Sequence, residues 1–197
     1  MINIFFRGFI IGWAFSLMAC SPSPAILVDS YQRSSRSHLY ELQQWQFQGR
    51  LALQTANDSW AASLDWQHNL NKDALKLSGP LGVGAVLINL DSGAIRIDTG
   101  NGKPEYSQNP DKLLTEKLGH FVPVSALKYW VLGLTDPNLA VVDFDNGFQQ
   151  AGWRVEFKQM QLLGAELMPR KMVLTDGMSK LKLIIGQWTM PNLIKGR

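Results

Sequence analysis

The feature that most constrains the fold is a repeated alternation of apolar and polar residues with a period of two. In the stretch SWAASLDWQ (residues 59–67), the even positions 60, 62, 64 and 66 are Trp, Ala, Leu and Trp, and they alternate with the polar residues Ser59, Ser63, Asp65 and Gln67. Successive side chains of a β-strand point to opposite faces, so this stretch is predicted to be a strand with one apolar face. The same interpretation applies to residues 45–53, 73–79, 94–100, 139–147, 152–160, 170–177 and 180–188.

The connections between these strands contain turn-forming pairs. Residues 101–102, 146–147 and 176–177 are Asn-Gly or Asp-Gly, pairs that are typical of β-hairpins. Links of hairpin length predict antiparallel pairing of about ten or eleven strands. A sheet of that size is expected to curl.

Two short helices are predicted in the middle of the chain. The first has Asn109 as its N-cap and Pro110 at its first position. The second begins at Pro123 and ends at Gly133. Because they interrupt the strands, we expect both helices to lie in the hollow of the curled sheet.

The N-terminus carries a processing signal. Arg7 precedes an apolar run over residues 8–17 that is too short for an ordinary membrane-spanning helix but suits a secretory signal. The run ends in LMAC (residues 17–20), which resembles the bacterial lipobox, where cleavage precedes a cysteine that carries diacylglycerol. The alternative is a buried thiol behind an uncleaved anchor. Ser21 follows the cysteine instead of aspartate, which resembles an outer-membrane sorting signal.

The chain is therefore divided into three parts. Residues 1–19 are predicted to be a lipoprotein signal peptide and residues 20–37 a lipidated tether, because their Ser- and Pro-rich composition cannot build a core. Residues 38–197 are predicted to form a single domain that begins with a short helix over residues 38–45.

No constellation for catalysis or metal binding is recognisable. The histidines His38, His68 and His120 are scattered and are interpreted as solvated or capping side chains. Asp143 and Asp145 share one strand face but have no partner for acid–base chemistry. With 19 basic and 16 acidic residues dispersed along the chain, nucleic acid is not an expected ligand. We therefore expect neither an enzyme nor a bound cofactor or metal.

The tryptophans leave two interpretations open. They either fill the core of the curved sheet or line a cavity that is open to an acyl chain. Six of them are spread through the predicted domain: Trp45, Trp60, Trp66, Trp130, Trp153 and Trp188.

Several motifs occur together in a characteristic order. They are WQFQGRLAL (45–53), ASLDWQ (62–67), LSGPLG (77–82) and FVPVSALKYWVLGL (121–134), preceded by the lipobox cysteine. This combination resembles the LolB family of outer-membrane lipoprotein receptors, over the chain from Cys20 to about Leu134. The resemblance implies an incomplete antiparallel β-barrel covered by short helices, with an apolar cavity between them.

The resemblance also implies a function. Members of this family accept lipoproteins from the periplasmic carrier LolA and insert them, without ATP, into the inner leaflet of the outer membrane. The implied partners are LolA, acylated client lipoproteins and outer-membrane phospholipid, and the protein is expected to be a monomer anchored through Cys20. The alternative is a lipid-anchored scaffold or assembly protein with a filled aromatic core.

Two sets of residues are assigned to this function. The match of the Pro-Leu-Gly turn implies that Leu81, flanked by Pro80 and Gly82, is a loop residue that enters the membrane. The alternative is that Leu81 folds back onto its own hairpin. The predicted acyl-chain cavity consists of inward-facing strand and helix residues: Leu51, Leu53, Leu64, Trp66, Leu75, Leu77, Val86, Ile88, Ile95, Ile97, Trp130 and Val155.

Overall fold

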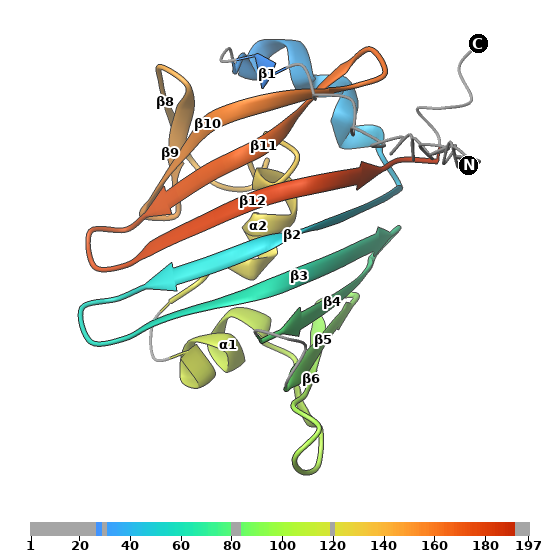
Figure 1. Ribbon diagram of the computed structural model, residues 1–197, viewed down its shortest axis with the longest axis vertical. Coiled ribbons are helices and arrows are strands. Elements are labelled where there is room, and N and C mark those ends of the chain that lie inside the picture. The colour runs from blue at the N-terminus through green and yellow to red at the C-terminus, as the bar shows by residue number, and fades with distance from the viewer. Residues whose placement is uncertain (1–26, 29–30, 80–83, 119–120, 192–197) are drawn as a thin grey trace, which may run out of the picture.

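The computed structural model describes residues 27–28, 31–79, 84–118 and 121–191 (Figure 1). The strands within these ranges are β1 (Leu27–Val28), β2 (Gln44–Gln54), β3 (Ser59–Asn69), β4 (Lys72–Ser78), β5 (Ala85–Asp91), β6 (Ala94–Asp98), β7 (Glu105–Ser107), β8 (Val141–Phe144), β9 (Gly147–Gln150), β10 (Trp153–Leu163), β11 (Glu166–Thr175) and β12 (Lys180–Thr189). The helices are the 3₁₀ helix η1 (Arg33–Glu41) and the α-helices α1 (Pro110–Leu118) and α2 (Val124–Trp130).

All of these strands belong to one antiparallel sheet. Its order is β7-β6-β5-β4-β3-β2-β12-β11-β10-β9-β8, and β1 pairs with β10 beside this path. The described strands β7 and β8 end the path without pairing with each other, so the curved sheet is open. The prediction of a mainly β fold built on an incomplete antiparallel barrel is confirmed.

The alternating pattern decides which face of the sheet is buried. On β2, Phe47 and Leu53 are buried, whereas Gln48 and Arg50 on the opposite face are exposed. Trp66 on β3 is directly opposite Phe47 in the antiparallel register, so inward side chains of neighbouring strands meet. The predicted strand faces are confirmed here because apolar residues two apart can be buried together only on the same face.

The two α-helices cover the buried face. In Figure 1, β12 and β2 pass in front of α2, and α1 lies behind the lower part of the sheet. Asn109 caps α1, because its side-chain Oδ1 accepts a hydrogen bond of 3.0 Å from the backbone N–H of Lys112. Gly133 has a positive φ of 75° after α2, which ends the helix as predicted. Among the residues that the structure describes, no helix has the length and apolar character needed to cross a bilayer.

The N-terminal segment differs from the prediction. A helix was expected over residues 38–45. The helix found there is η1, which begins five residues earlier at Arg33 and ends at Glu41, and β2 begins at Gln44. The predicted tether also extends too far, because Tyr31 and Arg36 are buried against the domain. Composition alone misleads here, since a buried arginine is tolerated when its N–H groups find acceptors. The Arg36 guanidinium donates to the carbonyl oxygens of Leu132 and Leu167.

Candidate functional site: an apolar cavity under the sheet

A cavity of about 450 Å³ lies between the concave face of the sheet and the helices. Its walls come from β2 to β6 on one side, from β11 and β12 on another, and from α1 and α2. A volume of this size is in the range of small-molecule and cofactor sites. The cavity is present because the inward side chains of this part of the sheet do not reach the helices that cover it.

Nine of the twelve residues predicted for the cavity line it. They are Leu51, Leu53, Leu64, Trp66, Leu75, Leu77, Val86, Ile88 and Ile97. The structure therefore brings together side chains from five consecutive strands, β2 to β6. They were selected as residues on one face of their strands, for the cavity that the family resemblance implies.

The other three predicted residues, Ile95, Trp130 and Val155, are buried but are not part of the cavity wall. The indole N–H of Trp130 donates to Oε1 of Gln150 at 2.9 Å, which holds this side chain against β9. Val155 lies on β10, opposite Phe148 of β9. Strand alternation predicts that a side chain points inward, but it does not predict whether other side chains already fill the space in front of it.

Several wall residues were not predicted. The helical side contributes Leu114, Val124 and Leu127, and β12 contributes Leu181 and Leu183. The signals for them were present, because Leu127 belongs to the apolar stripe of the second helix and Leu181 and Leu183 alternate with lysines. Predicting Leu181 and Leu183 as wall residues required knowing that β12 pairs with β2.

The wall is suited to hydrocarbon. Most of it consists of leucine, isoleucine, valine and alanine, together with Trp60 and Trp66. Lys117 is the charged member among the described wall residues, and its ammonium is paired with the carboxylate of Glu105 at 2.5 Å. With few polar groups to orient a ligand, the cavity selects for apolar character and not for a particular functional group.

The Trp66 indole is fixed by a buried polar network. Its Nε1–H donates to Oδ1 of Asp73 at 2.8 Å, and Nδ1 of His68 contacts the same oxygen at 2.8 Å. The Trp45 ring stacks on the His68 ring with 5.0 Å between centroids. The interpretation of His68 as a solvated side chain is therefore wrong, because it is a largely buried partner of Asp73 on a strand.

The remaining polar candidates have structural partners. Nε2 of His38 lies 3.0 Å from a carboxylate oxygen of Glu166. The carboxylate of Asp143 accepts from Nε of Arg33 at 2.7 Å, and this hydrogen bond lowers the pKa of Asp143 below its ordinary value. Asp145 lies in the turn after β8 and is exposed. His120 is outside the described residues.

The described residues on both sides of residues 80–83 lie at the cavity. Gly79 follows β4 and Gly84 precedes β5, and both are part of the cavity wall. The backbone N–H of Gly79 donates to the carbonyl of Gly84 at 3.2 Å, which joins these two residues. Leu81, with Pro80 and Gly82, lies outside the described residues, as does Cys20.

An open antiparallel barrel with an apolar cavity under two helices defines a class of small β-proteins that enclose apolar ligands. Comparison with known proteins narrows the class. A family model described as "Outer membrane lipoprotein LolB" matches residues 43–188. The chain belongs to the LolB family of outer-membrane lipoproteins.

Individual relatives agree with this assignment. The outer-membrane lipoprotein LolB of Chromohalobacter salexigens is 32% identical over 158 residues, which cover 77% of this chain and 73% of the relative. The LolB proteins of Halorhodospira halophila and Alkalilimnicola ehrlichii are 29% and 30% identical, over 84% and 90% of this chain and 87% and 93% of the relatives. The similarity thus spans the sheet, both α-helices and the cavity.

Proposed function

We propose that this protein receives acylated lipoproteins from the periplasmic carrier LolA and inserts them into the inner leaflet of the outer membrane. The observation that carries the proposal is the cavity of about 450 Å³ with its hydrocarbon wall, in a chain of the LolB family. The cavity also counts against the alternative of a scaffold with a filled aromatic core. Lipidation of Cys20 would hold the protein at the membrane in which the clients are inserted.

The proposed transfer moves acyl chains from one apolar environment to another, and no covalent bond is made or broken. Each CH₂ group removed from water stabilises the bound state by about 0.8 kcal/mol, so ten methylenes contribute about 8 kcal/mol. A client therefore requires an apolar site at every stage between carrier and bilayer. Transfer without ATP proceeds when each site binds the acyl chains more favourably than the previous one. We expect no enzymatic activity.

Within this function, Leu81 is the proposed membrane-entering residue, flanked by Pro80 and Gly82. Support comes from the described residues on both sides of residues 80–83, because Gly79 and Gly84 are joined by a hydrogen bond and belong to the cavity wall. Burying one leucine contributes about 1.5–3 kcal/mol, enough for a reversible contact with the bilayer.

The test is transfer of a lipoprotein from loaded LolA to this protein, measured by separation of the two proteins after mixing. Ala62 lies on the cavity wall, and Ala62→Trp places a large ring in the space proposed for the acyl chain. We expect this variant to accept clients at least about tenfold more slowly, because the loss of apolar contact exceeds the equivalent of 1.4 kcal/mol.

The matched control is Ala74→Trp on the exposed face of β4. It adds the same ring without entering the cavity, and its transfer rate should be that of the unmodified protein. Normal transfer by a folded Ala62→Trp protein would disprove the role of the cavity. Acyl binding without onward delivery to vesicles would identify a static lipid-binding protein instead.

A further inference from the structure

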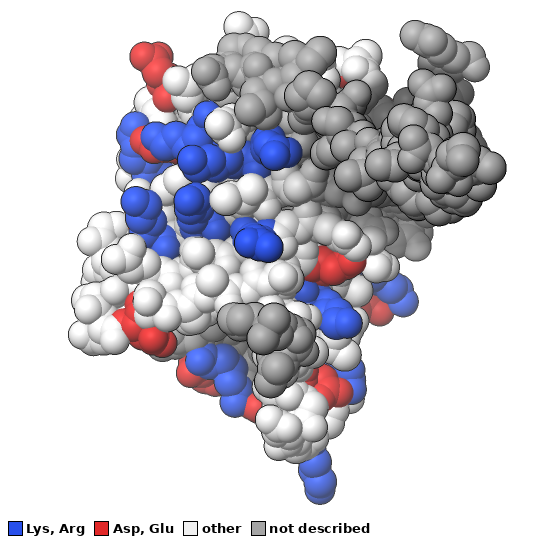
Figure 2. All heavy atoms as spheres, in the orientation of Figure 1, with Lys and Arg blue, Asp and Glu red and all other residues white. Residues whose placement is uncertain are grey.

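The outer face of the sheet carries a cluster of cations on β2, β11 and β12. In Figure 2, Lys and Arg side chains gather over these strands and over β10, on the face turned away from the helices. Arg50 of β2 and Lys171 of β11 flank Ile184 from its two sides, and Lys182 and Lys180 follow along β12. Directly paired side chains are about 5 Å apart at Cβ, so Arg50 and Lys171, on the two sides of Ile184, are about 10 Å apart. These four residues are called the basic face below.

The four cations of the basic face form no ion pair with carboxylates of the described residues. No carboxylate of that part of the chain lies within ion-pair distance of the four cations, whereas neighbouring Arg154 and Lys158 on β10 share Glu156. Four like charges that repel one another in the free protein attract an anionic surface at close range.

The cations border a shallow hollow on the outer face. Lys180, Lys182, Ser59 and Gln54 surround it, and Ala52 and Ala61 are among its walls. Ala52 is paired with Lys182 on one side and with Ala61 on the other, so small side chains leave space beside the lysines. Two ammonium groups, a hydroxyl and an amide offer the donors that a phosphate group accepts.

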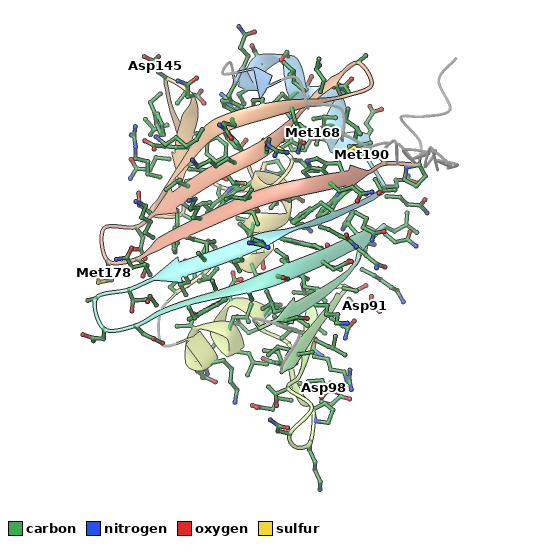
Figure 3. All side chains as sticks on the ribbon, viewed as in Figure 1. Asp91, Asp98, Asp145, Met168, Met178 and Met190 are labelled. Carbon is green, nitrogen blue, oxygen red and sulfur yellow. The ribbon has the colours of Figure 1, made fainter. Side chains whose placement is uncertain are left out.

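An exposed apolar side chain lies at the end of the same hairpin. Met178 in the turn between β11 and β12 is 78% exposed, and Figure 3 places it at the tip of this hairpin. The backbone N–H groups of Met178 and Ser179 both donate to Asp176 Oδ1, so the turn is ordered and presents the methionine to solvent. An apolar tip followed by lysines is typical of a segment that contacts the bilayer interface.

We propose that the basic face, with Met178, docks on anionic phospholipid headgroups of a bilayer. The exposed methionine favours a lipid surface over an acidic protein, because it gains burial only if the partner offers an apolar layer beneath the charges. The proposal rests on the membrane location of the chain and does not require that clients pass through the cavity.

The position of the anchor agrees with this face. Leu27 pairs with Gln161 on β10, and the proposed lipidation site Cys20 precedes it by seven residues. Seven residues span at most about 25 Å, so the acylated end must enter the bilayer within that distance of β10. β10 is the strand next to β11, which carries Lys171, so an anchored protein can lay the basic face on the same leaflet.

The test is lysine footprinting on the acylated protein held in vesicles. The vesicles consist of phosphatidylcholine alone or of phosphatidylcholine mixed with phosphatidylglycerol, and lysine acetylation rates are read by mass spectrometry. We expect acetylation of Lys180 and Lys182 to be at least about fivefold slower on the anionic vesicles at low salt, and to recover at high salt. Lys112 on α1 and Lys128 on α2, on the other side of the sheet, serve as internal controls that do not change.

Variants sharpen the assignment. Lys180→Gln combined with Lys182→Gln should remove the protection of Lys171, whereas Lys112→Gln with Lys128→Gln should leave it intact. Equal acetylation on both vesicles overturns the proposal. Protection that appears only when loaded LolA is added also overturns it, because the face would then be a protein-docking site. Client transfer on the same vesicles reports separately on the function proposed above.

Discussion

The two halves of the sheet carry the same alternating sequence pattern but enclose different interiors. Inward side chains of β8 to β10, called the packed half, include Phe148 and Phe157, which are fully buried. The ring of Tyr31, from the N-terminal segment, stacks on Phe157 with 4.1 Å between centroids. Inward side chains of β2 to β6, called the hollow half, include Leu51 and Leu77, which remain partly exposed at the wall of the cavity.

Buried hydrogen bonds explain how the helices can cover a cavity without collapsing into it. Oε1 of Gln150 on β9 accepts from the Trp130 indole at 2.9 Å and from the Asp136 N–H at 2.8 Å, and its Nε2 donates to the carbonyls of Asp136 and Leu139. This network fixes the C-terminal end of α2 to the packed half. The other end of α2 then extends over the hollow half, where Leu127 lines the cavity. The packed half supports a binding site in the hollow half.

The largest expected difference between the halves is in stability. Phe157→Ala in the packed half should lower the free energy of unfolding by about 3–5 kcal/mol, because a new cavity forms in a filled region. Leu77→Ala in the hollow half should cost only about 1 kcal/mol, because its side chain already faces open space. Denaturant unfolding measures both. Equal losses for the two variants would contradict the division of the sheet into these halves.

The difference between the halves also marks how far the sequence could predict the structure. Period-two alternation and hairpin pairs predicted most of the strands and their antiparallel pairing, because both depend on local geometry, but β5 and β7 were not predicted as strands. Nine of the residues assigned to the cavity with the help of the family resemblance line it. Trp130 and Val155 point inward as expected, but Gln150 and Phe148 fill the space around them. Whether an inward side chain meets a neighbour or a cavity depends on distant segments, so periodicity cannot decide it.

The N-terminal segment illustrates the same limit with polar residues. The stretch SYQRSSRS (residues 30–37) has the composition of a tether, yet Arg36 is only 4% exposed and is bound to the backbone carbonyls of Leu132 and Leu167, which are 96 and 131 residues away. No local signal identifies such acceptors. His68 was likewise misinterpreted because Asp73, its partner, lies across a hairpin and is unremarkable in sequence.

The next largest effect concerns the attachment of this segment to the packed half. Arg36→Met should lower the free energy of unfolding by about 2–3 kcal/mol, because the carbonyls of Leu132 and Leu167 lose their buried donor. Arg154→Met removes an exposed arginine beside Glu156 and should cost less than about 1 kcal/mol. Thermal or denaturant unfolding of the two variants compares them directly, and a neutral Arg36→Met would refute the role of this contact.

A smaller effect is expected from the proposed membrane-entering residue. Leu81→Glu should leave client acceptance from LolA unchanged but slow insertion into vesicles by about tenfold, because a carboxylate cannot enter the apolar layer. The matched control is Leu70→Glu, since Leu70 is 58% exposed in the turn between β3 and β4, at the other end of β4. If Leu81→Glu inserts clients at the same rate as this control, Leu81 has no role in insertion.

The smallest effect is a titration in the packed half. The hydrogen bond from Arg33 lowers the pKa of Asp143, so the charged pair ties η1 to β8 above the ordinary carboxyl pKa. Because the folded-state pKa is depressed, this contribution to stability is lost as the pH falls through it. Carbon-13 NMR of the Asp143 carboxyl should give a pKa below the ordinary value in the unmodified protein and a higher one in Arg33→Gln. An unchanged pKa in Arg33→Gln would mean that the pair is absent in solution and that the buried contacts of Tyr31 and Arg36 alone hold the segment.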